Sequence, residues 1–272
     1  MAVMDLRPLG LGELLDRAFS LYRRNFFLFF GIAGIPQAIL FAVSFAAQIF
    51  RDIPGIGAIL ALLTVVAGIT QLVGYALSEG ATVYAVSELL LGRQTTIRQS
   101  YRLVRGEIGT IIAVLFLAGL LALAGFVLLI VPGVYIILAT SLAVPAAVLE
   151  NIHAREAIRR SMDMTKGHKG RVFVILVLVF VLSVVAFGLF ELPFDYLLQQ
   201  GGHAALFNIL SQLGGLFAGI VVAPLGTITF SLLYYDIRVR DEAFDLQMMM
   251  AQLDGGPLPT PRSPGPLSIL GQ

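Results

Sequence analysis

The chain has 272 residues, of which 58% are hydrophobic and only 13% charged, and its mean hydropathy of +0.90 excludes an ordinary soluble globular protein. It has no cysteine, which excludes a disulfide, a thiolate zinc site and a catalytic thiol, and its net charge of +1 gives no reason to expect a nucleic-acid partner. The composition is typical of a multi-pass membrane protein, in which the positions of Lys and Arg matter more than their total.

An amphipathic segment and two apolar segments open the chain. Between Leu11 and Tyr22 the apolar side chains recur on one helical face, which predicts an interfacial helix at the membrane surface. Phe26 to Phe50 is a stretch of about 25 residues without a charge, long enough to cross a hydrocarbon core of roughly 30 Å. A second apolar segment runs from Gly57 to about Leu91 and contains Glu79. These two segments predict the first pair of spans.

The middle of the chain contains one long apolar run. Gly92 to Gly106 is a short charged segment with apolar residues on one side, and from Ile108 to Leu149 no residue is charged. That run is too long for one crossing, and Pro132-Gly133 is a pair that breaks helices. We therefore expect two spans here, Ile108 to Val131 and Val134 to Leu149.

A charged amphipathic helix precedes the last pair of spans. From Ala154 to Thr165 apolar and small residues occupy one helical face and charged residues the other. Val172 to Phe190 are almost all Val, Ile, Leu or Phe, which makes bilayer insertion favourable by about 5 to 10 kcal/mol. We expect a fifth span from Phe173 to Phe190, a polar loop from Glu191 to His203, and a sixth span from Ala204 to Tyr235.

The end of the chain changes composition again. Asp236 to Gln252 predicts a last amphipathic helix, and the residues after it are rich in proline, which prevents them from forming a packed core. We expect two units. Residues 1–253 form a six-span membrane domain with an N-terminal interfacial helix, and residues 254–272 form a disordered cytoplasmic tail.

The 18 Lys and Arg residues fall almost entirely on one side of this arrangement. Only Arg51 lies in a predicted loop on the other side, so the positive-inside rule places both termini in the cytoplasm. If Ile108 to Leu149 crossed the membrane only once, the basic segment that follows it would lie outside the cell. The charge bias therefore supports two spans in this run. The sequence predicts an all-α polytopic membrane protein, with six transmembrane helices as three helical hairpins and cytoplasmic amphipathic helices.

Two of the basic segments match each other. Ile97 to Gly106 and Ile158 to Gly167 share Ile, Arg, Ser, a basic residue and Gly in the same order, and each is followed by a span. This indicates a repeated unit of amphipathic helix, span, outer loop and span. The alternative is that boundary helices on the cytoplasmic side commonly have this pattern without common ancestry.

Three segments resemble a bacterial membrane family. They are the opening LRPLGLGELLDRAFSLYRRN, the central VLENIHAREAIRRSMDMTKGHKGRVF and the closing LLYYDIRVRDEAFDL. Over most of its length the chain resembles uncharacterised bacterial multi-pass membrane proteins related to the membrane domain of glycerophosphodiester phosphodiesterases. In the full-length enzymes that domain is joined to a catalytic barrel with a His-Arg-Gly motif and paired acidic residues.

Neither of these catalytic features is present in this chain. No His is followed by Arg-Gly, and no segment is large enough for the barrel. The resemblance therefore implies a bacterial cytoplasmic membrane and a relation to lipids or their head groups, without the hydrolase activity.

The sequence contains few residues in patterns that indicate chemistry. No Ser lies in a nucleophile-elbow pattern, no Gly-rich piece has the context of a phosphate loop, and the three His have no ligand-like spacing. We expect no catalytic residue, no metal and no cofactor. The pair Gly215 and Gly219 instead predicts close packing of helices within the membrane.

One candidate site is a basic cluster at a membrane boundary. Cations there attract anionic lipid head groups by about 1 kcal/mol per charge. The alternative is that the cluster only fixes the topology. Its members are Arg155, Arg159, Arg160, Lys166, Lys169 and Arg171.

A second candidate is Glu79, with Gln71 two turns earlier on the same helix. Inserting a carboxylate at the centre of a span costs about 2.5 to 3.5 kcal/mol of free energy. If Glu79 lies at a span centre, we therefore expect its side chain to be protonated and hydrogen-bonded, with Gln37 and Gln212 as further polar partners. If the span covers only Gly57 to Ser78, Glu79 is interfacial instead.

These features favour a non-enzymatic integral membrane protein that binds or organises membrane lipids, including anionic ones, or a membrane protein partner. The alternative is a small-molecule or lipid transporter or channel, favoured by polar residues in spans one, two and six. An intramembrane enzyme is least favoured, because Glu79 is the one acid available within the bilayer.

Overall fold

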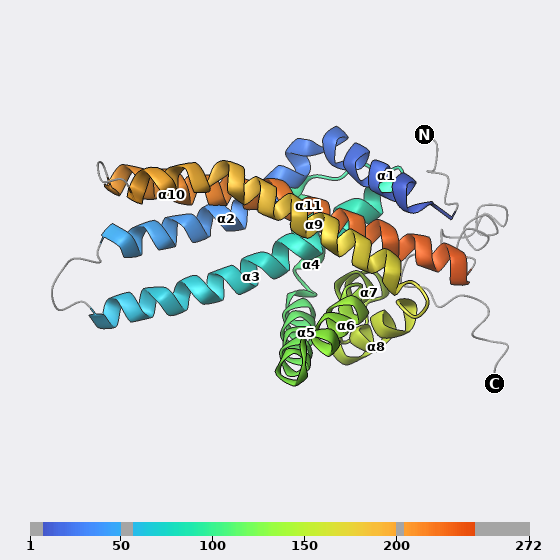
Figure 1. Cartoon of the computed structure of the whole chain (residues 1–272). Helices are drawn as coiled ribbons and strands as arrows, with labels where there is room; N and C mark the ends of the chain where they lie inside the picture. Colours follow the sequence, from blue (N-terminus) through green and yellow to red (C-terminus); the bar gives the residue numbers. More distant parts are fainter. Residues whose placement is uncertain (1–7, 50–56, 200–203, 243–272) are drawn as a thin grey trace.

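The computed structural model describes residues 8–49, 57–199 and 204–242, and every regular element among them is a helix (Figure 1). Six stretches of the described chain are long and apolar enough to cross a membrane, so the protein is an all-α, multi-pass membrane protein, as the sequence predicted. The helices are α1 (Leu11–Arg24), α2 (Phe26–Ile49), α3 (Gly57–Leu90), α4 (Ile97–Val104), α5 (Ile108–Leu128), α6 (Ile130–Thr140), α7 (Ala143–Glu150), α8 (Ala154–Met164), α9 (Lys169–Phe190), α10 (Leu192–Gln199) and α11 (Ala204–Glu242).

The long apolar run is divided in two, as predicted, but not at the predicted residues. The break is at Leu129, which has extended backbone angles, and Pro132 and Gly133 lie inside α6. Pro132 is in the first turn of α6, where the backbone N–H that proline lacks would have no helical partner. The second half of the run bends once more, between α6 and α7.

Two predicted boundaries near the end of the chain are wrong. The segment expected to be a polar loop contains α10, held to α11 by a hydrogen bond from the Ser211 hydroxyl to the Asp195 carboxylate. The predicted sixth span and the start of the predicted last amphipathic helix are not separate helices, because α11 continues without a break from Ala204 to Glu242. The rest of the predicted last amphipathic helix and the Pro-rich tail lie outside the described residues.

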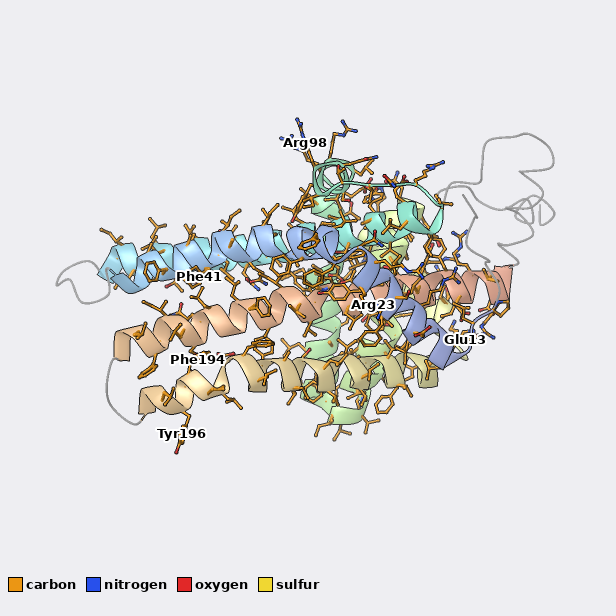
Figure 2. All side chains as sticks on the ribbon, turned by 90° about the horizontal axis from the view of Figure 1, so that it is seen from above. Glu13, Arg23, Phe41, Arg98, Phe194 and Tyr196 are labelled. Atoms are coloured by element: carbon orange, nitrogen blue, oxygen red, sulfur yellow. The ribbon has the colours of Figure 1, made fainter. Side chains whose placement is uncertain are left out.

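The apolar helices pair as three hairpins, α2 with α3, α5 with α6, and α9 and α10 with α11. In Figures 1 and 2, which are turned by 90°, α2, α3, α9 and α11 run side by side along one axis. The α5–α6 hairpin lies across that axis in both views. We call the end of the long bundle where α9 begins and α11 ends the basic end, and the opposite end, where α2 ends and α3 begins, the loop end.

The packed core lies toward the basic end. Along α3, most side chains from Gly57 to Tyr75 are at least partly exposed, whereas most from Ala76 to Ser87 are buried. At Gly80 an added Cβ would lie 2.3 Å from the Val104 side chain and 2.5 Å from that of Ile111, so α4 and α5 both approach α3 there. The apolar faces of α1, α4 and α8 are buried in this core.

Candidate functional site

An open apolar groove lies between α2 and α3, with a volume of about 430 Å³. Such a volume is within the usual range for ligand pockets, roughly 300 to 1,000 Å³. Several of its side chains are exposed, among them Ile39 at 52% and Ile69 at 59%, so the groove faces the surroundings of the bundle. Its lining consists of Ile35, Pro36, Ile39, Ile69, Thr70, Val73, Gly74, Leu77 and Tyr101.

One wall of the groove is Tyr101, which belongs to the amphipathic helix α4. Its hydroxyl donates a hydrogen bond to the carbonyl oxygen of Ile32. That carbonyl would normally accept from the residue four positions later, but this residue is Pro36, which has no N–H. Burial raises the pKa of Tyr101 to about 12, so at neutral pH the hydroxyl is protonated and able to donate. The proline in α2 thus creates the acceptor that holds α4 in place.

The outer face of α4 is strongly basic. Arg98, Arg102 and Arg105 are exposed, and Figure 2 shows Arg98 pointing away from the bundle. Arg98 and Arg105 lie three residues before and four residues after Tyr101, so they border the face of the helix that carries Tyr101 while their side chains are exposed. None of the three arginines pairs with a carboxylate of a described residue. Positive charge therefore stands beside one end of an apolar groove.

A small polar cavity lies behind the groove, between α2, α3 and α11. It brings together Gln37, Gln71 and Glu79, three of the four intramembrane polar residues named from the sequence. The cavity shares Pro36, Thr70 and Gly74 with the groove. The free space inside it is about 30 Å³, enough for one or two water molecules.

The Glu79 carboxyl has one oxygen, Oε2, that is buried and has no hydrogen-bond partner among the described residues. Tyr75, one turn earlier on α3, interacts with this carboxyl through its hydroxyl. No described Lys or Arg lines the cavity. A buried polar atom without a partner is uncommon, and here it marks a place for a water molecule or a proton.

The fourth residue named from the sequence, Gln212, lies elsewhere. It is on α11 but does not line the cavity, and its side-chain amide donates to Asn208 one turn earlier. Two residues of the cavity that the sequence did not single out are Thr82 and Pro224. Pro224 is inside α11, and its presence in an apolar helix was a signal comparable to that of Pro36 in α2.

The six residues of the basic boundary cluster are not equivalent. Arg155 and Arg159 are exposed on α8. Lys166 pairs with Asp163 at 2.7 Å and holds the pKa of that carboxyl below its usual value. Lys169 lies over the ring of Tyr135, 4.4 Å from its centre.

The other two members of that cluster bind carboxylates of the protein. The Arg160 Nε donates to Glu150 at 2.9 Å, and the same carboxylate accepts from the Tyr234 hydroxyl at 2.8 Å. Arg171 pairs with Asp236. These contacts engage both guanidinium groups in joining helices, which leaves the exposed members of the cluster as the candidates for lipid head groups.

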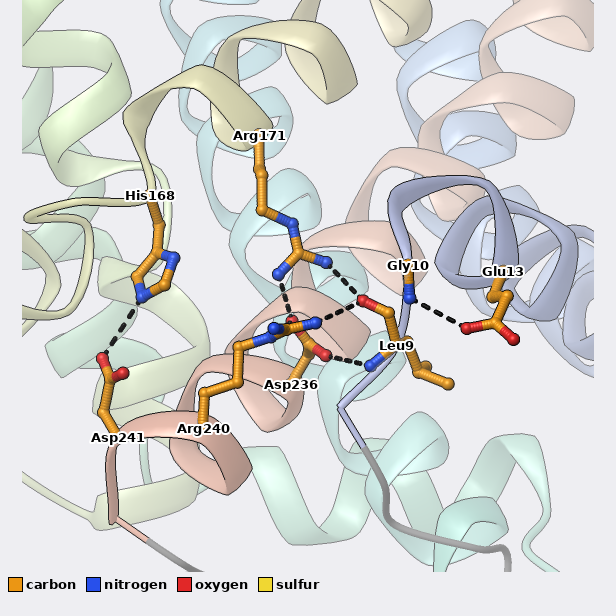
Figure 3. A network of polar contacts seen from close by, with 8 residues as sticks. All are labelled: Leu9, Gly10, Glu13, His168, Arg171, Asp236, Arg240 and Asp241. Atoms are coloured by element: carbon orange, nitrogen blue, oxygen red, sulfur yellow. Dashed lines mark hydrogen bonds and ion pairs between the residues drawn. The ribbon is translucent and has the colours of Figure 1, made fainter.

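Asp236 is the centre of a network that ties both ends of the described chain together (Figure 3). Its side chain is fully buried and accepts from the Leu9 backbone N–H at 2.7 Å, from Arg171 at 2.5 Å and from Arg240 at 2.9 Å. Both arginines also donate to the Leu9 carbonyl oxygen. The segment before α1 is thereby fixed to α9 and α11.

Each hairpin ends in a comparable way. Glu88 on α3, Glu150 on α7 and Asp236 on α11 each lie near the basic end of the returning helix and each pair with an arginine. Glu79 differs from all three because it lies nine residues further into α3 and has no arginine partner among the described residues.

Searches for related proteins add no candidate activity: no family model, no curated protein and no solved structure matches the chain. The resemblance drawn from the three sequence segments therefore remains an expectation. Among the residues that the structure describes, no three His, Asp or Glu side chains are grouped so that they could hold a metal ion.

Proposed function

We propose that this chain is a non-enzymatic integral membrane protein that binds an anionic membrane lipid, with an acyl chain in the α2–α3 groove and the head group at α4. The observation that carries the proposal is the apolar groove, which ends at Tyr101, on the same helix as three exposed arginines. We further propose that the membrane is the bacterial cytoplasmic membrane and that the basic end faces the cytoplasm, because 17 of the 18 Lys and Arg residues fit that side.

The lining of the groove matches a hydrocarbon chain. Ile35, Ile39 and Leu77 offer aliphatic surface along the groove. The groove opens toward the bilayer, so a lipid can enter sideways without crossing a polar barrier. A water-soluble ligand would lose its hydration there without gaining hydrogen bonds.

The head group would meet the cations of α4. Phosphate accepts hydrogen bonds from arginine in a bidentate arrangement, which is stronger than the attraction to a single exposed charge. This site differs from the exposed surface of α8, where Arg155 and Arg159 attract head groups by charge alone and the attraction weakens with salt.

The proposal is tested by filling the groove. Val73→Trp places a large side chain among its lining residues, whereas Val65→Trp makes the same change at an exposed position of α3 outside the groove. Purified protein is washed with detergent in about 1 M salt, where the Debye length is about 3 Å, and retained phospholipid is counted by native mass spectrometry. We expect wild type and Val65→Trp to retain about one anionic lipid per chain and Val73→Trp to lose most of it.

The head-group part is tested separately with two matched double variants. Arg98→Gln with Arg102→Gln removes two charges from α4, and Arg155→Gln with Arg159→Gln removes two from α8. The α4 variant should lower the amount of lipid that resists high salt several-fold, and the α8 variant should lower only the fraction that high salt removes.

Equal retention of lipid by Val73→Trp and wild type would show that the groove is not the lipid site.

A second candidate function, a proton-linked transporter or channel, is favoured by the cavity around Glu79. Its free space of about 30 Å³ suits water or a proton rather than a larger solute. In liposomes with a pH-sensitive dye inside, Glu79→Gln should abolish a proton flux, while Glu88→Gln, at an acid paired with Arg93, should leave it intact. A flux that is unchanged in Glu79→Gln would remove this function.

A further inference from the structure

The α5–α6 hairpin presents an apolar surface that no described part of the chain covers. Ten large apolar side chains of this hairpin are between 43% and 79% exposed, and no residue from Ile108 to Leu149 is charged. An apolar surface of this extent in a membrane protein faces lipid. The exposed residues are Phe116, Leu120, Leu123, Phe126, Val127, Leu128, Leu129, Ile130, Val131 and Tyr135.

The hairpin is a single tightly packed unit. At Gly125 an added Cβ would lie 2.8 Å from the Gly133 Cα atom, and at Gly133 it would lie 2.5 Å from the Phe126 ring. The two helices therefore approach closely beside the turn at Leu129. The buried residues of α5 near its start are Ile111 and Val114, so it joins the rest of the protein through its first turns and projects beyond them.

The direction of this hairpin differs from that of the other apolar helices. Figures 1 and 2 show α2, α3, α9 and α11 along one axis and the hairpin across it. If the four long helices follow the membrane normal, the hairpin lies in the membrane plane. The distribution of Lys and Arg is the same for a crossing and for an in-plane hairpin, because in both cases the chain returns to its own side.

The contact between Tyr135 and Lys169 fixes the depth of the hairpin. Tyr135 follows the turn at Leu129 by six residues, about 9 Å of helix. In a hairpin that crossed the membrane, Tyr135 would therefore lie in the half of the bilayer away from the basic end. The Lys169 ammonium, 4.4 Å from the Tyr135 ring, is instead at the first residue of α9, at the basic end. Tyrosine and lysine together are typical of the membrane interface.

We propose that the α5–α6 hairpin does not cross the bilayer but lies in the plane of the membrane, inserted among the acyl chains of the leaflet at the basic end. Its partner is that lipid leaflet. The whole hairpin then occupies one depth, and it displaces lipid in one leaflet only. This placement depends on the crossing of the four long helices and not on the lipid site in the α2–α3 groove.

The chain has no Trp, so single tryptophans report depth without background. Three single variants place a tryptophan at an exposed position of α5: Phe116→Trp, Leu123→Trp and Val127→Trp. The first and last positions are eleven residues apart, about 16 Å along the helix. Quenching by phospholipids brominated at different acyl positions measures the distance of each indole from the bilayer centre. We expect the three variants to show the same quenching profile, with depths in one leaflet.

The matched control is a pair on α3, Leu62→Trp and Ile69→Trp, both at exposed positions seven residues apart. Because α3 runs along the bundle, these two should differ in depth by about 10 Å. A depth gradient along α5 as steep as that along α3 would overturn the proposal.

The chain also has no Cys, so labelling gives a second test. In sealed cells, Tyr196→Cys near the loop end should react with an impermeant maleimide, and Leu129→Cys at the turn of the hairpin should not. Labelling of Leu129→Cys from the same side as Tyr196→Cys would show that the hairpin crosses.

Discussion

Replacing Asp236 removes the centre of the network that joins the segment before α1 to α9 and α11. The side chain is 0% exposed, and Arg171 and Arg240 are 21% and 32% exposed. Removing one partner of a buried ion pair usually costs about 3 to 5 kcal/mol. Because both arginines reach water in part, we expect Asp236→Ala to lower the free energy of unfolding by about 2 to 4 kcal/mol.

The measurement is chemical unfolding in detergent micelles followed by circular dichroism, and the matched control is Asp241→Asn. Asp241 lies on the same helix and pairs with His168 at 3.3 Å, but its side chain is 51% exposed. We expect this control to lose under about 1 kcal/mol, as exposed pairs do. A loss in Asp236→Ala no larger than the loss in Asp241→Asn would refute the view that this network holds the basic end together.

Three further predictions concern packing, surface charge and the end of the chain. Gly214→Ala should destabilise the protein by more than about 2 kcal/mol, because its Cβ would lie 1.8 Å from the Phe190 carbonyl oxygen. Gly219→Ala should be neutral in the same unfolding assay, because nothing lies within 4 Å of its added Cβ; the close packing that the sequence predicted at Gly219 is wrong, and the close approach is at Gly214 instead. Removing residues 255–272 should leave membrane insertion and thermal stability unchanged, and a large loss in a thermal-shift assay would show that this segment is docked. Neutralising four members of the basic boundary cluster, Arg155, Arg159, Lys166 and Lys169, should weaken salt-sensitive retention of anionic vesicles and preserve the labelling pattern of the spans. Unchanged retention at low salt would contradict this expectation.

The sequence predicted the helices well where composition alone decides them. The uncharged run from Phe26 and the run from Gly57 give α2 and α3 within one residue at each end, because a span needs only length and apolarity. It failed at α10, where Glu191, Pro193 and Asp195 suggested a loop. Acidic residues and proline are also common in the first turn of a helix, and Pro193 and Asp195 lie in the first turn of α10.

The direction of the α5–α6 hairpin could not be predicted from its residues. The hairpin contains no charged residue, and the charge bias specifies the side on which its ends lie but not its tilt. The tilt follows from packing at a few positions, such as Gly80 against Ile111, which are far apart in sequence.

The candidate sites were predicted in part. Gln37, Gln71 and Glu79 meet in one cavity because helices α2 and α3 form a hairpin, as expected. Tyr101 was missed as a site residue, since its role depends on the Ile32 carbonyl that Pro36 frees, 69 residues away. Similarly, Arg171 could not be assigned to Asp236 because 65 residues separate them.

The central claim is that the α2–α3 groove holds the acyl chain of an anionic lipid, and photo-crosslinking tests it most directly. The protein is extracted in native membrane discs, exchanged with a phospholipid carrying a diazirine on its acyl chain, irradiated and mapped by peptide mass spectrometry. The account predicts adducts concentrated at Ile39, Ile69 and Val73, well above those at Phe180 and Val184, which are exposed on α9 outside this groove. Adducts spread equally over α9 and the groove would contradict it.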